Sequence, residues 1–206
     1  MRTKIILSEE EIATLHNKDF FRVKKNILAK AESVLGEIAN DEELKHEWKK
    51  IIASGNETVF QPKISRGENY EGLPWLMLDF PKQFEKQNQF AVRTFFWWGN
   101  YFSVFILLSG SSLKKFLPLM QMHFDSLQKN NFQISNNQNP FGHKVDAKNF
   151  IPMKKISKQK LKSIAAENKY LLLAAILPLS KFKKAKEFIR SNHLLLQQIL
   201  HQAPRR

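Results

Sequence analysis

The chain contains 206 residues, with 33 Lys and Arg against 19 Asp and Glu, and it has no cysteine. Its hydrophobic content of 43% and its 17 Phe and 4 Trp exclude a disordered chain, and the lack of cysteine excludes disulfide scaffolds, thiolate metal sites and cysteine nucleophiles. The longest apolar runs, at 95–108 and 170–179, are shorter than the ~20 residues of a membrane-spanning helix, and the run Ile5–Leu7 is too short for the core of a signal peptide. We therefore expect a cytoplasmic globular protein with one domain over residues 1–206.

The first fifty residues are predicted to form two or three helices. Ser8 and Glu11 have the spacing of a capping box, which opens a short helix. Asp19 can cap a second helix, in which apolar residues recur every three or four positions as far as Ile38. A further helix is expected to begin near Asn40 and to end at the Ser-Gly-Asn sequence of residues 54–56.

A change to alternating hydrophobicity at Thr58 indicates strands. We expect one strand at Val59–Ile64 and a second at Leu76–Phe80, after a proline that suits a strand start. The clearest signal is a hairpin over Phe90–Trp98 and Tyr101–Ser109, because these two β-rich runs flank a Gly-Asn pair that is typical of a type II′ turn.

The predicted two-residue turn sets the register of this hairpin. It places Trp98 opposite Tyr101 and Arg93 opposite Ile106. Both faces of the two runs are mostly apolar, so we expect the hairpin to lie at the centre of the sheet and to be covered on both sides.

The C-terminal half is predicted to alternate helices with a strand. Ser111 and Ser112 can cap a helix whose apolar stripe continues to Leu127. The polar stretch 130–153 is expected to be a long loop that can include a short strand at Phe132–Ser135. After it, the pattern indicates a helix at Ser157–Glu167, a buried strand at Tyr170–Leu177 and an amphipathic helix at Ser180–Gln202.

Together these elements indicate the α+β fold class. We expect a mixed, mainly antiparallel sheet with a central hairpin at about residues 90–109, flanked by N-terminal helices and by two or three C-terminal helices. Within the single domain, we assign residues 1–54 to a helical segment, 58–110 to the sheet core and 111–206 to a basic half of helices and strands.

The positive charge is confined to the C-terminal half. Residues 1–110 contain 15 basic and 15 acidic residues, whereas residues 111–206 contain 18 basic and 4 acidic residues. Such an asymmetry is typical of proteins that contact nucleic acid, an acidic protein or an anionic surface. The alternative is a solvated lysine-rich face, because Arg is rare here and Arg is the residue that favours base readout. The candidate phosphate- or anion-binding residues are Lys154, Lys155, Lys158, Lys183, Lys184 and Lys186.

The standard catalytic and metal-binding motifs do not occur in this sequence. It has no nucleophile elbow, P-loop, dinucleotide-binding glycine motif or zincin motif, and its six histidines are scattered along the chain without nearby ligands. We therefore predict no metal site, no cofactor and no catalytic residue, and the sequence favours a protein that is not an enzyme.

Arg93 is the most unusual polar residue, because it stands in an otherwise apolar strand. A buried guanidinium must be paired, and Asp79 and Glu68 are its natural partners. One interpretation is an ion-pair network that fixes the strand register; the other is a pocket in which Arg66 and Arg93 hold an anionic ligand. The candidate ligand-binding residues are Arg66, Glu68, Asn69, Tyr70, Asp79, Arg93 and Trp97.

Three sequence blocks in this region resemble a known group of proteins. The blocks Arg66–Tyr70, Gly72–Pro81 and Phe90–Asn100 are similar to a family of uncharacterised bacterial proteins found mainly in the Bacteroidetes. The resemblance implies no activity, cofactor or catalytic residue, but it marks residues 66–100 as the centre of interest.

Three functional hypotheses follow from these observations. The first is a non-catalytic binding or scaffold protein whose basic C-terminal half faces an acidic partner. The second is a small anionic-ligand binder, or an enzyme, built on the cluster of Arg66, Glu68, Asp79 and Arg93. The third is a nucleic-acid-binding protein, with lysines on phosphates and loop aromatics such as Phe132 and Phe141 stacked on bases.

Overall fold

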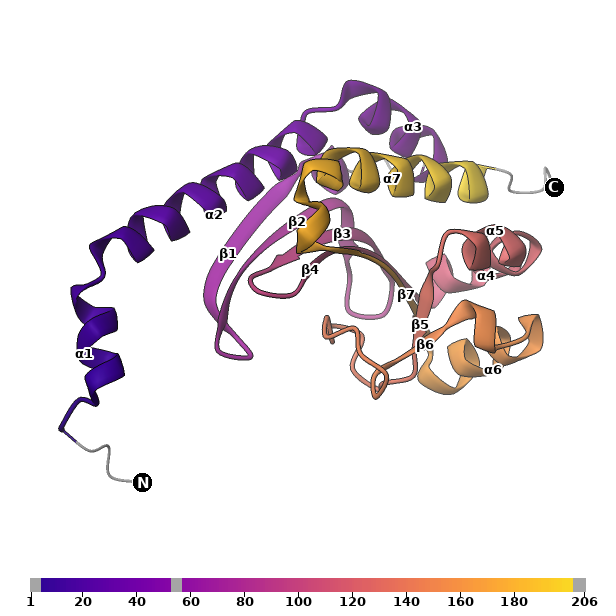
Figure 1. The fold of residues 1–206 in the computed structure, drawn as a ribbon. Coiled ribbons are helices and arrows are strands. Elements are labelled where there is room, and N and C mark those ends of the chain that lie inside the picture. Colours follow the sequence, from indigo (N-terminus) through magenta and orange to yellow (C-terminus); the bar gives the residue numbers. More distant parts are fainter. Residues whose placement is uncertain (1–4, 53–56, 202–206) are drawn as a thin grey trace.

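The computed structural model describes residues 5–52 and 57–201, which form the predicted α+β fold (Figure 1). The strands form one sheet in the order β1-β2-β3-β4-β7-β5-β6, and every neighbouring pair of described strands is antiparallel. The strands are β1 (Lys63–Tyr70), β2 (Leu73–Phe84), β3 (Gln89–Trp97), β4 (Tyr101–Ser109), β5 (Gln133–Ser135), β6 (Phe150–Pro152) and β7 (Tyr170–Pro178).

The helices pack mainly on one face of this sheet. The α-helices are α1 (Glu9–His16), α2 (Lys18–Ala39), α3 (Glu42–Ile52), α4 (Gly110–Met122), α5 (Phe124–Lys129), α6 (Lys158–Asn168) and α7 (Ala185–His201). Short 3₁₀ helices are η1 (Glu57–Phe60), η2 (Met153–Lys155) and η3 (Leu179–Lys184). Figure 1 shows α2, α3 and α7 lying together along the same face. No helix within the described residues is both long and apolar enough to cross a membrane.

The first N-terminal helix begins where its capping residues predicted, and the cap of the second lies two residues before the predicted one. The Ser8 hydroxyl accepts a hydrogen bond from the Glu11 amide, and the Glu11 carboxylate accepts one from the Ser8 amide, which completes the capping box. The second helix is capped by Asn17, whose side chain accepts from the Phe20 amide, rather than by Asp19. The predicted end of the third helix at residues 54–56 lies outside the described residues.

Two strand predictions need correction. The segment predicted as a strand at Val59–Ile64 begins as η1, and β1 starts only at Lys63. Val59 and Phe60 are both buried, and two consecutive residues cannot both point into the core from one face of a strand. The predicted strand at Leu76–Phe80 is longer, because β2 extends from Leu73 to Phe84 and pairs with strands on both sides.

The central hairpin forms, but with a register one residue away from the predicted one. Trp97, not Trp98, lies opposite Tyr101, and Arg93 lies opposite Phe105. The Asn100 amide donates to the Trp97 carbonyl oxygen, and Gly99 has a φ of 72°. Gly99 is therefore at the second central position of the turn, where type II turns require a positive φ, and the type II′ assignment is wrong.

The C-terminal elements follow the predicted order, with two breaks in the helices. The predicted helix over 113–127 is interrupted at His123, which separates α4 from α5. The predicted C-terminal helix begins with η3, and regular α-helix starts only at Ala185. The short strand expected at Phe132–Ser135 is present as β5, and it pairs with β7 in the sheet.

The sheet is buried on both faces at its centre. The larger core lies between the sheet and the helices and includes Leu35, Phe96 and Ile106. A smaller core on the opposite face contains Phe95 and Phe105, and the loop that joins β5 to β6 supplies Val145 to it. The expected burial of the hairpin on both sides is thus confirmed, and the loop-covered face is where the candidate site lies.

Candidate functional site

Arg93 is largely buried and is paired with Asp79. The two residues are direct neighbours on β3 and β2, and their side chains point to the loop-covered face. Arg93 Nε donates to Asp79 Oδ1 at 2.6 Å and Nη2 donates to Oδ2 at 3.3 Å. The two side chains are only 13% and 9% exposed. This two-point pairing is the geometry in which Arg binds a carboxylate most strongly, and it confirms the prediction that Arg93 pairs with an acid.

His143 completes the environment of Arg93. Its Nε2 lies 3.0 Å from Arg93 Nη1. A guanidinium cannot accept a hydrogen bond, so Nε2 must be the acceptor, and the proton of the neutral ring must be on Nδ1. Burial, reinforced by the positive charge of Arg93, lowers the pKa of His143 to about 3. The imidazole is therefore neutral at physiological pH.

Aromatic rings cover the outer side of the guanidinium. The centroids of the Phe84 and Phe141 rings lie 5.3 and 5.7 Å from Arg93 Cζ, within the range of cation–π interactions. The two rings also contact each other. Phe141 comes from the same loop as His143, so this loop and the end of β2 together cover Arg93.

Two tyrosines hold the loop against the sheet. The Tyr70 hydroxyl oxygen accepts a hydrogen bond from the His143 amide at 3.1 Å. The Tyr101 hydroxyl donates to the His143 carbonyl oxygen at 3.1 Å and accepts from the Val145 amide at 2.7 Å. Burial raises the pKa of Tyr101 to about 12, so its hydroxyl stays protonated. These bonds fix the position of His143 relative to β1 and β4.

A cavity of about 350 Å³ lies beside the ion pair, within the size range of small-molecule sites. Its lining residues are Lys63, Ser65, Tyr70, Trp75, Met77, Asp79, Arg93, Phe95 and His143. Strands β1 to β3 form its floor and the loop forms its far wall. Gly67 allows the cavity to be closed by Trp75, because a Cβ at this position would lie 2.5 Å from Trp75 Nε1.

The cavity has an excess of positive charge. Asp79 is the one acid among its described lining residues, whereas Lys63 and Arg93 are both cationic. Burial lowers the pKa of nearby Lys82, the negative charge of Asp79 opposes that shift, and the positive charge of Lys63 adds to it. Two cations and one carboxylate therefore line the cavity, and both oxygens of that carboxylate already accept hydrogen bonds from Arg93.

The side-chain hydrogen-bonding groups left over in the cavity are mainly donors. The Lys63 ammonium, the Trp75 indole N–H and the His143 Nδ1–H make no hydrogen bond to any described residue. The Ser65 and Tyr70 hydroxyls likewise have no described acceptor for their protons. An arrangement of unused donors next to surplus positive charge is complementary to a ligand rich in acceptors, such as a carboxylate or a phosphate.

The structure brings together only part of the predicted cluster. Tyr70, Asp79 and Arg93 border the cavity. Glu68 points to the helical face, where it forms an ion pair with Lys24 of α2 at 2.6 Å. Arg66 shares that face, because it is two residues from Ile64, which packs against the larger core.

The remaining two predicted ligand residues have structural roles. The Asn69 side chain accepts a hydrogen bond from the Gly72 amide and closes the turn between β1 and β2. Trp97 is buried in the smaller core and donates to the Tyr70 carbonyl oxygen at 3.1 Å. Neither residue lines the cavity.

Sequence reasoning missed Lys63, Ser65 and His143. Alternation along β1 places Lys63 and Ser65 on one face, but the predicted strand ended at Ile64, before Ser65, and the position of Lys63 opposite Asp79 depends on the pairing of β1 with β2. His143 lies in an irregular loop, where no periodicity indicates which residue approaches a distant strand.

The six candidate lysines form two separate groups. Lys154, Lys155 and Lys158 lie on η2 and at the start of α6, and Lys183, Lys184 and Lys186 lie on η3 and at the start of α7. Figure 1 shows α6 and the start of α7 at opposite ends of β7. The lysines therefore do not form one continuous anion-binding face.

Some of the C-terminal basic charge is neutralised by the N-terminal helices. Lys186 forms an ion pair with Glu37 of α2. Arg190 of α7 pairs with Asp41 and Glu43 at the start of α3. The charge imbalance of the sequence is consequently smaller at the surface of the folded chain.

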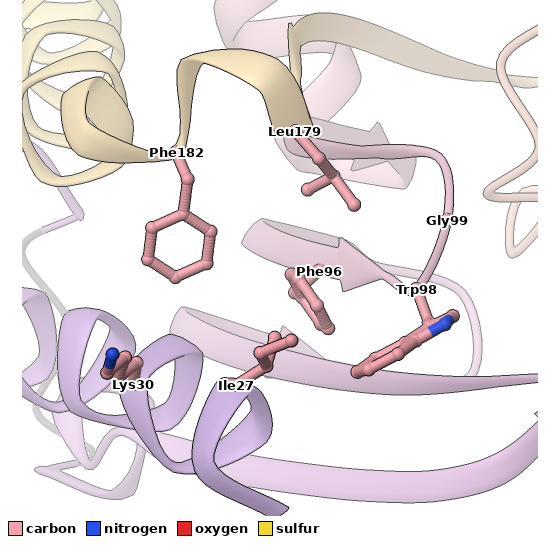
Figure 2. A pocket seen from close by; sticks show the side chains of 7 residues that line it. All are labelled: Ile27, Lys30, Phe96, Trp98, Gly99, Leu179 and Phe182. Carbon is pink, nitrogen blue, oxygen red and sulfur yellow. The ribbon is translucent and has the colours of Figure 1, made fainter. Parts of the chain in front are cut away.

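A second hollow is almost entirely apolar. Figure 2 shows Ile27 of α2, Phe96 and Trp98 of the hairpin, and Leu179 and Phe182 of η3 around this groove, with Lys30 at its rim. Its volume is about 370 Å³. We call it the η3 groove. It lies on the helical face, away from Arg93.

The described residues contain no group of three or more His, Cys, Asp or Glu side chains placed to hold a metal ion. No protein-family model, curated protein or solved structure matches this chain. The resemblance to a bacterial family therefore stays a prediction.

Proposed function

We propose that this protein binds a small anionic ligand with a planar, apolar body in the cavity beside Asp79 and Arg93. The unused donors of the cavity, which include the Lys63 ammonium and the Trp75 indole N–H, carry this proposal. An anionic group would accept hydrogen bonds from them. Tyr70, Trp75 and Phe95 supply aromatic surface on which a planar body can pack.

The site favours binding over catalysis. A general base needs a free lone pair and a pKa near the working pH. His143 Nε2 accepts from Arg93, and the pKa of His143 is about 3. Both oxygens of Asp79 are bound by Arg93. His143 is therefore not available to take a proton from a ligand, and the ion pair with Arg93 holds the Asp79 side chain in place, so we infer a binding protein.

Benzoate is a suitable probe, with benzamide as its neutral counterpart of similar shape. Titration of the full chain, followed by tryptophan fluorescence because Trp75 lines the cavity, should detect benzoate binding and little binding of benzamide. Lys63→Gln should weaken benzoate binding about tenfold, the effect of losing one charge-assisted hydrogen bond.

Lys160→Gln is the matched control, because it removes the same charge from an exposed position on α6. It should leave benzoate binding unchanged. Equal loss of binding in both variants would mean that only net charge matters, and equal binding of benzoate and benzamide would contradict recognition of an anion.

A further inference from the structure

Exposed apolar side chains are concentrated at the N-terminal end of the molecule. We define residues 5–23 as the arm. Helix α1 contains no buried residue, and the first buried residue of α2 is Ala31. In Figure 1, α1 and the first turns of α2 extend beyond the sheet. The large exposed apolar residues of the arm are Ile5, Ile6, Leu7, Ile12, Leu15, Phe20, Phe21 and Val23.

The apolar stripe of α2 continues past the point where the core ends. Leu35 and Ala31 of α2 are fully buried in the larger core, and Ile27 of the same helix is partly buried against that core. Val23 and Phe20 continue this stripe at helical spacing, but they are 49% and 45% exposed. A contiguous apolar surface of this kind on a soluble chain marks an interaction site.

The η3 groove lies next to this stripe, and Ile27 belongs to both. The groove is lined by apolar side chains, and its surroundings are basic. Lys30 is at its rim, and Lys181, Lys183 and Lys184 are exposed on η3 and make no ion pair with a described residue. An occupant of this groove should therefore be apolar and acidic.

Helix α1 has that chemistry. Its first turn consists of Glu9, Glu10 and Glu11. Its apolar residues Ile12 and Leu15 are 44% and 69% exposed. The arm is thus complementary to the η3 groove both in charge and in its apolar surface.

In the structure, α1 lies away from the η3 groove of its own chain, because α2 extends beyond the sheet before α1 joins it (Figure 1). The arm of a second copy is not restricted in this way. Phe21, near the start of α2, is 61% exposed and lies outside the buried part of this helix. In a twofold pair the arm of each copy lies along the η3 groove of the other, so one axis generates both contacts.

We propose that the arm of each chain docks into the η3 groove of a second copy, forming a twofold dimer. A membrane surface is a weaker match for the arm, because anionic lipid headgroups would repel the three glutamates of α1. The dimer does not depend on the proposed ligand, since the groove and the cavity lie on opposite faces of the sheet.

Light scattering on size-exclusion fractions of the full chain tests the dimer. The native protein should have twice the chain mass of 24.1 kDa, and Phe21→Glu should have the mass of one chain. Met122→Glu is the matched control, because Met122 is 63% exposed but lies at the end of α4; this variant should stay dimeric. A monomeric native protein, or a Phe21→Glu variant that is still dimeric, would overturn the proposal.

Charge reversal tests which surfaces meet. Glu9→Lys with Glu10→Lys should weaken dimerisation about tenfold, and Lys181→Glu with Lys183→Glu should do the same. Glu11 is left in place because it belongs to the capping box. All four substitutions in one chain should restore the dimer.

Two further results would contradict the proposed surfaces. If the variant with all four substitutions is no more dimeric than either double variant, α1 does not contact the lysines of η3. If the native chain is monomeric but sediments with vesicles of phosphatidylcholine and phosphatidylserine, the arm binds membranes instead of a second copy. Benzoate binding should be the same in Phe21→Glu and in the native chain, which separates this test from that of the cavity.

Discussion

Two histidines are kept neutral by burial, and each accepts a hydrogen bond from a different neighbour. His143 accepts from Arg93, as described above. His193 of α7 is fully buried and its Nδ1 lies 3.2 Å from Trp48 Nε1. An indole nitrogen only donates, so His193 Nδ1 is the acceptor and Nε2 carries the proton. Burial lowers the pKa of His193 to about 4.

These two histidines should make the fold sensitive to mild acid. Both pKa values are lower in the folded chain than the ordinary value of 6.5, so the unfolded chain takes up protons first. The histidine contribution to stability is complete above pH 6.5. As pH falls toward 4, the free energy of unfolding should decrease by about 1.4 kcal/mol per pH unit for each histidine.

Urea denaturation between pH 7 and pH 4.5 measures this slope. His193→Gln should be less stable than the native chain at pH 7, because its packing with Trp48 is changed, but its stability should depend less on pH. A slope equal to that of the native chain would show that His193 is not the source of the acid sensitivity.

The Arg93–Asp79 pair can be separated from its surroundings by a double-mutant cycle. Arg93→Met leaves a buried carboxylate and should cost about 3–5 kcal/mol, while adding Asp79→Leu should recover part of that loss. Glu68 is the matched control, since it points to the opposite face and pairs with Lys24. In thermal unfolding, the losses of stability caused by Arg93→Met and Asp79→Leu should not be additive, whereas those caused by Arg93→Met and Glu68→Gln should be. Non-additive losses with Glu68→Gln instead would mean that the faces of β1 are wrongly assigned.

At the scale of elements, the start of α4 is held by the turn between β2 and β3. Ser109 at the N-cap makes no side-chain hydrogen bond to the helix. Instead, Asn88 Oδ1 accepts from the Ser111 hydroxyl at 2.8 Å and from the amide and hydroxyl of Ser112 at 3.0 Å. Gly110 permits this close approach, because its φ is 57° and a Cβ there would lie 2.0 Å from the Gln87 carbonyl oxygen.

Asn88→Ala should therefore behave as the loss of a helix cap, although Asn88 is far from α4 in the sequence. We expect it to reduce the free energy of unfolding by about 1–2 kcal/mol. Gln87→Ala is the matched control on the same turn, because the Gln87 side chain is exposed, and it should change stability by less than about 0.5 kcal/mol. Equal effects in guanidinium denaturation would show that the turn, and not the cap, sets the stability.

At the scale of the whole molecule, α7 links the basic C-terminal half of the chain to the N-terminal helices. Arg190 pairs with acids of the α2–α3 connection and α3, and Gln197 Nε2 donates to the Leu44 carbonyl oxygen at 2.8 Å. The basic half and the neutral half therefore form one structure. The cavity lies on the loop-covered face of the sheet, and the η3 groove and the arm lie on the helical side.

The sequence by itself determined the elements and one key contact. Helices follow from apolar spacing and from capping residues such as Ser8, because these signals are local. The buried pairing of Arg93 could be predicted, since an apolar strand cannot hold an isolated charge. The choice of Asp79 over Glu68 could not, because it depends on which face of the sheet each acid occupies.

The tertiary structure decided which residues lie opposite each other in paired strands and which distant segments come into contact. A shift of one residue exchanges the faces of a strand, and the one-residue error in the hairpin changed the neighbour of Arg93 from Ile106 to Phe105. The pairing of β1 with β2 placed Lys63 opposite Asp79, at the cavity. His143 reaches Arg93 from 50 residues away because Tyr70 and Tyr101 bind its loop. No local pattern encodes such contacts, since their free energy arises only when distant segments have already packed together.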